Sequence, residues 1–143
     1  MRPRYETEAD LTREQMVMER IAKARPSITA YHKVKNPSYG VDFWVESSSG
    51  CYVIEIKCRV GKYDSWRVAL SKVLKARVWE DSGFPAILCV HWDGDDSIYT
   101  ARPFGDNPTP YTAEWNGRTK KTRGDECDME PHATFKLGDM RKL

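Results

Sequence analysis

The chain has 143 residues, of which 40% are hydrophobic, and its formal net charge is +2 at pH 7. This length and this apolar content predict one domain, 1–143, with a single core sheet flanked by helices. No apolar run reaches the roughly 18 residues of a membrane-spanning helix, and the charged N-terminus does not resemble a signal peptide. These features exclude a membrane-embedded protein and predict a cytoplasmic one.

A helix is predicted from about residue 11 to residue 25, with Asp10 or Thr12 as its N-cap. On a helical wheel its apolar side chains form one stripe, which consists of Leu11, Val17, Met18, Ile21 and Ala22. Glu14 falls within this stripe, whereas Glu19 points away from it. A carboxylate on the core-facing side of a helix is costly unless it has a partner. The position of Glu14 therefore needs a specific explanation.

Three strands are expected to follow this helix. Residues 27–35 predict the first strand, and residues 36–40 predict a turn. The runs at 41–45 and 52–57 are rich in β-branched and aromatic residues and are joined by Ser-Ser-Ser-Gly. They therefore predict an antiparallel β-hairpin.

Two acidic side chains and one lysine lie on this hairpin. Side chains alternate along a strand, so Glu55 and Lys57 project from the same face, where Asp42 can meet them. One interpretation is an ion pair on a solvated surface. The second strand is otherwise apolar on both sides, however, which is typical of a strand buried on both faces. Charge at such a position is costly unless it is paired or bound to a metal ion.

The second half of the core is predicted as a helix, a strand and a hairpin. The spacing of apolar residues predicts a helix over 64–81 and a buried strand over 86–92. A strand, a helix and a strand in that order imply a right-handed crossover between parallel neighbours, so the sheet is mixed. An Asp-Gly turn at 93–94 predicts a hairpin into a strand over 97–102, and the aspartates nearby are interpreted as its polar tip.

The remaining residues, about 103–143, predict a C-terminal β extension that follows a core over about 8–102. Strands are expected at 111–116 and 133–137. A glycine-bracketed basic segment lies between them, and it contains Arg118, Lys120, Lys121 and Arg123. This segment is either a contact for phosphate groups or a solvated linker, because acidic residues follow it at once.

A second group of basic residues lies between the hairpin and the end of the second helix, and it includes Arg59, Lys62 and Lys72. Clustered positive charge of this kind suits a nucleic-acid partner. For Lys72 the alternative is an ordinary solvated lysine on a helix surface.

The arrangement of Asp42, Glu55 and Lys57 resembles the signature of the PD-(D/E)xK nuclease superfamily, which includes restriction endonucleases, Holliday-junction resolvases and small phage nucleases. The superfamily places an aspartate on one central strand and an acid-x-lysine triplet on the next, between two helices. The resemblance in element order covers about residues 8–92. Val41 stands where the motif's name has a proline, which is commonly absent. The resemblance implies an α/β, restriction-endonuclease-like fold, with a mixed central sheet flanked by helices.

The resemblance also assigns roles to the hairpin residues. Asp42, Glu55 and the carbonyl group of Ile56 would hold Mg²⁺, or Mn²⁺ as its substitute, because these ions prefer oxygen ligands. Lys57 would orient the attacking water or stabilise the charge that develops on the phosphate. The sequence leaves open whether one or two ions act.

Two further roles come from the helices. The superfamily's first helix delivers a glutamate toward the metal, and Glu14 is followed by apolar residues at the expected offsets of three, four and seven. Glu8 and Glu19 remain alternatives to Glu14. Lys72 resembles a basic residue that members often carry on the second helix, near the scissile phosphate.

The function implied is that of a Mg²⁺-dependent deoxyribonuclease, specifically a DNA endonuclease with junctions or branched DNA as candidate substrates. Cleavage of both strands by so small a unit favours a homodimer. One alternative is a non-catalytic nucleic-acid-binding or assembly protein on the same fold. Another is an exonuclease.

Overall fold

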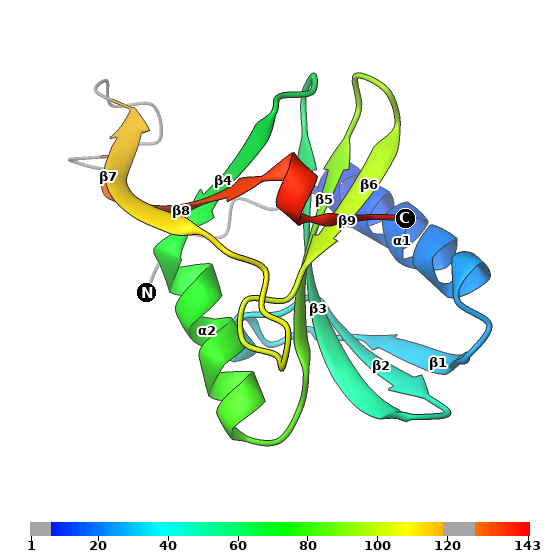
Figure 1. Cartoon of the computed structure of the whole chain (residues 1–143). Coiled ribbons are helices and arrows are strands. Elements are labelled where there is room, and N and C mark those ends of the chain that lie inside the picture. The colour runs from blue at the N-terminus through cyan, green and yellow to red at the C-terminus, as the bar shows by residue number, and fades with distance from the viewer. Residues whose placement is uncertain (1–6, 119–127) are drawn as a thin grey trace.

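The computed structural model describes residues 7–118 and 128–143 (Figure 1). Lys120, Lys121 and Arg123 of the predicted basic segment therefore lie outside the described residues. The helices and strands follow one another in this order: α1 (Glu8–Ala24), β1 (Ile28–Lys33), the short 3₁₀ helix η1 (Pro37–Tyr39), β2 (Phe43–Ser47), β3 (Gly50–Arg59), β4 (Ser65–Ala69), α2 (Leu70–Asp81), β5 (Ala86–Trp92), β6 (Ser97–Ala101), β7 (Thr112–Arg118), β8 (Asp128–Lys136), the 3₁₀ helix η2 (Leu137–Asp139) and β9 (Arg141–Lys142).

Six strands form one mixed sheet in the order β1-β2-β3-β5-β6-β9. β2 and β3 form the predicted hairpin, with residues 43–47 antiparallel to residues 50–54. β3 and β5 are parallel, with residues 53–59 beside residues 86–92, as the order of strand, helix and strand predicted. The mixed sheet expected of a restriction-endonuclease-like fold is therefore present.

The two helices cover opposite faces of this sheet. Val53 and Ile54 are neighbours on β3, yet they belong to different apolar clusters, because successive side chains of a strand point to opposite faces. The cluster of Ile54 contains the α1 residues Val17, Met18 and Ile21. The cluster of Val53 contains the α2 residues Val73 and Ala76. Each face of the hairpin is therefore covered by a different helix (Figure 1).

The helix α1 begins earlier than predicted. Its N-cap is Thr7, whose side chain accepts a hydrogen bond from the backbone N–H of Asp10 at 3.2 Å. The Asp10 carboxylate accepts the backbone N–H of Thr7 in return, at 3.1 Å, which completes a capping box. The prediction of Asp10 or Thr12 as N-cap was wrong because the third helical residue of this box is Asp in place of the usual Glu or Gln.

The predicted helix over 64–81 was wrong in its first part, which is the strand β4. Trp66 and Val68 are buried, and Arg67 between them is exposed, so this segment has the two-residue period of a strand. Trp66 is paired with Phe135 of β8 and stacks on its ring, with a centroid separation of 5.9 Å. The apolar residues of this segment fit both a helical period and a strand period. Its pairing with β8, a distant segment of the chain, makes it a strand.

β4, β8 and β7 form a second, antiparallel sheet in that order. Both predicted C-terminal strands exist and are longer than predicted, and Figure 1 shows β7 extending away from the rest of the molecule. The two-residue strand β9 then adds to the edge of the main sheet beside β6. It was not predicted, because two residues carry no readable period.

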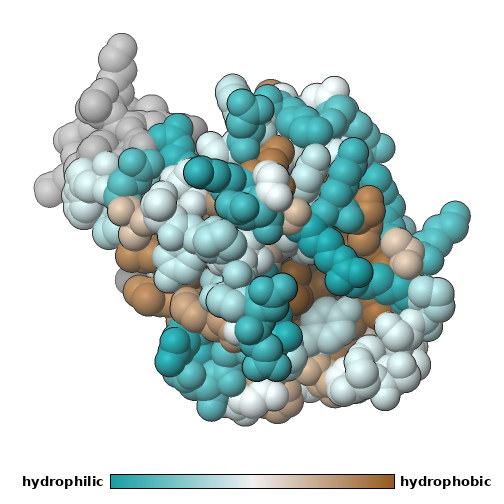
Figure 2. All heavy atoms as spheres, viewed as in Figure 1, coloured by the Kyte–Doolittle hydropathy of each residue, from teal (hydrophilic) through white to brown (hydrophobic). Residues whose placement is uncertain are grey.

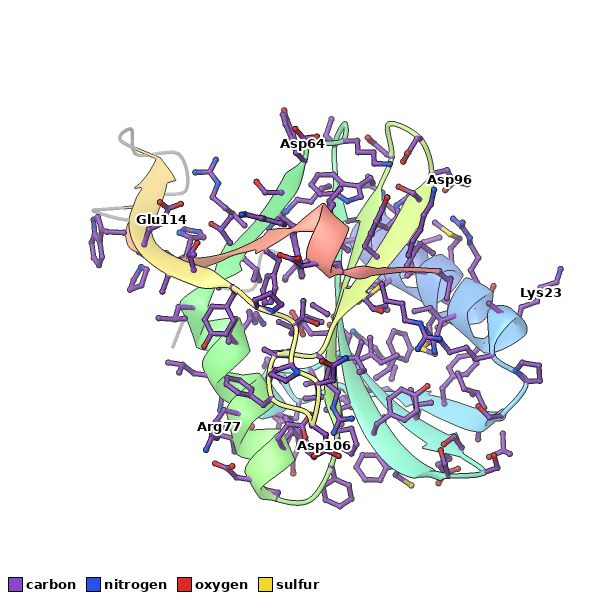
Figure 3. All side chains as sticks on the ribbon, in the orientation of Figure 1. Lys23, Asp64, Arg77, Asp96, Asp106 and Glu114 are labelled. Atoms are coloured by element: carbon purple, nitrogen blue, oxygen red, sulfur yellow. The ribbon has the colours of Figure 1, made fainter. Side chains whose placement is uncertain are left out.

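The turn between β5 and β6 carries Asp93, Asp95 and Asp96, as the Asp-Gly signal predicted, and Figure 3 shows Asp96 at this hairpin. Asp95 pairs with Lys62, and Asp96 pairs with Arg20 at 2.8 Å. These carboxylates are therefore polar groups of a loop tip.

Figure 2, in the view of Figure 1, shows a face that is largely hydrophilic, with smaller apolar areas between the hydrophilic ones. Neither of the described helices combines the length and the apolar character needed to cross a membrane.

Candidate active site

The carboxylate of Asp42 lies where the β2–β3 ladder ends. The backbone N–H of Asp42 donates to the carbonyl oxygen of Ile54 at 2.9 Å. Its side-chain Oδ2 then accepts a hydrogen bond from the backbone N–H of Ile56 at 2.6 Å. The carboxylate thus takes the place that the carbonyl oxygen of a further strand residue would have in the ladder. Asp42 is 7% exposed. The N–H and C=O of one strand residue point to the same side of the strand, so the carbonyl group of Ile56 also points toward Asp42.

The turn before Asp42 is held by α2. Gly40 has φ +68°, a conformation that favours glycine, and a Cβ there would lie 2.7 Å from Cγ of Lys75. Lys75 donates to the carbonyl oxygen of Ser38 at 3.1 Å. The indole N–H of Trp79 donates to the carbonyl oxygen of Tyr39 at 2.9 Å. α2 therefore positions the segment that delivers Asp42.

Glu55 lies on the face of β3 that α2 covers, and it is only 2% exposed. Its Oε1 lies 3.3 Å from Nζ of Lys57, two residues along the same strand, and 3.1 Å from Nζ of Lys72 in the first turn of α2. The pKa of Glu55 is raised to about 7, first by burial and then by the negative charge of Asp42, and the two lysines oppose this rise. The register of the hairpin pairs Phe43 with Ile54, and it therefore sets Asp42 beside Glu55.

Glu14 reaches the same region from α1, and it is 8% exposed. Its Oε2 lies 2.8 Å from Nζ of Lys33, at the end of β1, and that ammonium group lies 3.2 Å from Oδ1 of Asp42. Burial alone would lower the pKa of Lys33, but its contacts with Glu14 and Asp42 more than offset this, so the pKa is raised. Glu8 and Glu19 are exposed. Glu14 is therefore the glutamate that α1 directs to the hairpin, as its place in the apolar stripe predicted.

Lys33 was not singled out by the sequence. It lies in a polar stretch at the end of β1, with His32 and Lys35 nearby, and has no distinguishing spacing. Its place follows from the pairing of β1 with β2, which sets Lys33 beside Phe43. The ammonium group lies 5.4 Å from the centroid of the Phe43 ring, a cation–π distance. A contact that depends on strand register and helix packing leaves no local sequence signal.

Among the described residues, the carboxylates and ammonium groups of this site are equal in number. Three buried carboxylates, from Glu14, Asp42 and Glu55, face three lysine ammonium groups, from Lys33, Lys57 and Lys72. Within 7–118 and 128–143, no three His, Cys, Asp or Glu side chains are arranged as a metal-binding group. Two carboxylates and a backbone carbonyl group on adjoining strands nevertheless offer the oxygen donors that Mg²⁺ prefers. The donor chemistry at Asp42, Glu55 and Ile56 therefore fits a divalent ion.

The predicted nucleic-acid contacts differ in their surroundings. Lys72 lies at Glu55, inside the site. Arg59 is exposed at the end of β3, beyond Lys57. Lys62 pairs with Asp95 in the adjacent loop, which neutralises part of its charge. Arg118 is the last residue of β7. The structure thus places two of these basic residues, Arg59 and Lys62, at the end of the strand that carries Glu55 and Lys57.

A comparison with protein-family models supplies independent information about this chain. Residues 1–143 match a family described as "Phage putative PDDEXK endonuclease". A comparison with curated proteins found no match. The family's name contains the motif that Asp42, Glu55 and Lys57 are predicted to form. The chain belongs to this phage PDDEXK endonuclease family, within the PD-(D/E)xK nuclease superfamily that its hairpin resembles.

Proposed function

We propose that this protein is a divalent-metal-dependent DNA endonuclease that hydrolyses phosphodiester bonds, with Mg²⁺ as its cofactor and Mn²⁺ as a substitute. The observation that supports this most is the burial of Asp42 and Glu55 side by side on the hairpin, next to two ammonium groups. Burying two carboxylates beside each other is costly even when ammonium groups lie nearby. A divalent cation bound by both carboxylates would offset more of that cost.

Each residue of the hairpin has a distinct task in this proposal. Asp42, Glu55 and the carbonyl group of Ile56 would hold the ion. When bound, the ion would polarise a phosphate oxygen and lower the pKa of a water molecule. Lys57 and Lys72 present ammonium groups on the α2 side of Glu55, at 3.3 and 3.1 Å from its Oε1. There they can bind a phosphate oxygen and stabilise the negative charge of the transition state.

DNA is proposed as the substrate because the family is one of endonucleases and basic residues lie at the end of the same strand and just beyond it. Arg59 and Lys62 follow Lys57 along the chain, and both are exposed. They could bind the phosphates on one side of the scissile bond. We further propose that branched DNA, such as a four-way junction, is a preferred substrate, and that a homodimer cuts both strands.

The test is incubation of supercoiled plasmid and of a four-way junction with the protein in Mg²⁺, in Mn²⁺ and in a chelator. Wild type should nick the closed circle with either ion, and not in the chelator. Lys57→Ala should lower the rate by about 10²–10³. Lys35→Ala removes an exposed lysine of the loop after β1 and should leave the rate unchanged, which makes it the matched control.

Each alternative gives a different result in this experiment. An exonuclease would degrade linear DNA and leave the closed circle intact, because it needs an end. A binding or assembly protein would shift the DNA in a gel, with or without Mg²⁺, and would cut neither substrate. If Lys57→Ala cuts as fast as wild type, the hairpin is not the active site.

A further inference from the structure

The ammonium group of Lys33 lies between two buried carboxylates on the α1 side of the site. It is 2.8 Å from Oε2 of Glu14 and 3.2 Å from Oδ1 of Asp42. The ring of Phe43, whose centroid lies 5.4 Å away, provides a third favourable contact. Only 27% of the Lys33 side chain is exposed. One tethered cation thus bridges the two acids.

A second divalent ion would need this same position. In two-metal nuclease sites the ions lie roughly 3.5–4 Å apart and share carboxylate ligands. Here the acid available for such sharing is Asp42, and the buried carboxylate on its α1 side is Glu14, which Lys33 already bridges to it. An ion bound by both oxygens would have to displace the ammonium group, because the two cations would repel each other strongly at that separation.

The protein holds Lys33 in place before any ion arrives. The β1–β2 register sets Lys33 beside Phe43, and α1 brings Glu14 to it from above the sheet. A divalent ion, by contrast, must be taken from solution and must lose part of its water shell. On the other side of the site, Lys57 and Lys72 contact Glu55, and among the described residues no ammonium group bridges Glu55 to Asp42.

We propose that Lys33 is a built-in cation that replaces a second divalent ion between Glu14 and Asp42, so that this nuclease binds a single ion. The inference rests on the proposed function, since it assumes an ion at Asp42 and Glu55. Glu14 is then a positioning residue: it holds Lys33 at Asp42 and does not ligate the ion. Lys33 in turn neutralises part of the charge of Asp42 and orients its carboxylate.

The first test counts Mn²⁺ ions bound per chain, from the loss of the free-ion signal in electron paramagnetic resonance. The variants are Lys33→Met, the control Lys35→Met, which removes the same charge from an exposed position two residues later, and Asp42→Asn. Circular dichroism verifies that each is folded. Wild type and Lys35→Met should bind one ion, Lys33→Met should bind two, and Asp42→Asn should bind none.

The second test uses only the wild-type protein and does not depend on the folding of a variant. An amine-reactive reagent labels lysines in the presence and absence of Ca²⁺, and mass spectrometry compares Lys33 with Lys35. The labelling rate of Lys33 should stay low and unchanged when Ca²⁺ is added. A rate that rises toward that of Lys35 would show that the ion displaces the ammonium group, and the inference would be wrong.

The outcomes separate this inference from the proposed function. Two ions bound to wild type, or one ion bound to a folded Lys33→Met variant, overturn the role of Lys33 and leave the nuclease proposal in place. No ion bound to wild type, or one ion that remains in Asp42→Asn, overturns the metal site itself. In that case both proposals fail.

Discussion

Replacement of Glu55 by glutamine should stabilise the metal-free protein, and the gain should depend on pH. Burial raises the pKa of Glu55 from 4.5 to about 7, so the folded protein binds a proton more tightly than the unfolded chain does. Stability therefore falls as the pH rises from about 4.5 to about 7, because ionisation is favoured in the unfolded chain. At 1.36 kcal/mol per unit of pKa, this shift corresponds to about 3 kcal/mol. Glutamine resembles the protonated acid but cannot ionise, so the variant does not lose this stability as the pH rises.

The assay is urea unfolding followed by circular dichroism in a chelator, at several pH values between 4.5 and 8 for wild type and Glu55→Gln. The two proteins should have similar free energies of unfolding at pH 4.5, and the variant should be more stable by about 3 kcal/mol at pH 8. Glu19→Gln changes an exposed glutamate on α1 and serves as the control. Parallel pH curves for wild type and Glu55→Gln would refute the reasoning, since they would mean that ionised Glu55 is as stable in the fold as in the unfolded chain.

Two further predictions concern the turn that delivers Asp42. Gly40→Ala should destabilise the protein by roughly 1 kcal/mol more than Gly83→Ala; both residues have positive φ, but only at Gly40 does a Cβ meet a side chain, and urea unfolding measures the difference. Trp79→Phe removes the N–H that binds this turn, so it should lower the nicking rate and cost about 1 kcal/mol of stability. Trp92→Phe is its control, because the indole N–H of Trp92 has no hydrogen-bond partner within the described part of the chain; equal nicking rates would show that the turn does not depend on Trp79.

Local sequence patterns predicted those helices and strands whose apolar side chains repeat at a regular spacing. The apolar stripe of α1, the hairpin and the strand β5 were readable because each buries a face that repeats at a fixed spacing. The strand β4 was not readable, since Trp66 and Leu70 also fit a helical spacing. Its conformation depends on β8, which lies more than 60 positions further along the chain. Elements that depend on such distant pairing cannot be recovered from a local window.

The same distinction holds within the site. Glu55 and Lys57 could be placed on one face because side chains alternate along a single strand, and Glu14 could be placed by its helical stripe. Lys72 was placed near the site only by the resemblance to the nuclease superfamily, and in the structure its ammonium group contacts Glu55. Lys33 could not be found, because its contacts join three separate elements, β1, α1 and the start of β2.

The site also links the two apolar cores of the protein. α1 covers one face of the β2–β3 hairpin and contributes Glu14, whereas α2 covers the other face and contributes Lys72. Asp42 lies at the end of the hairpin's ladder, where its carboxylate contacts Lys33 on one side and influences Glu55 on the other. A shift of either helix against the sheet would therefore change the distance between a lysine and a carboxylate of the site. The packing of both cores thus sets the geometry on which the proposed chemistry depends.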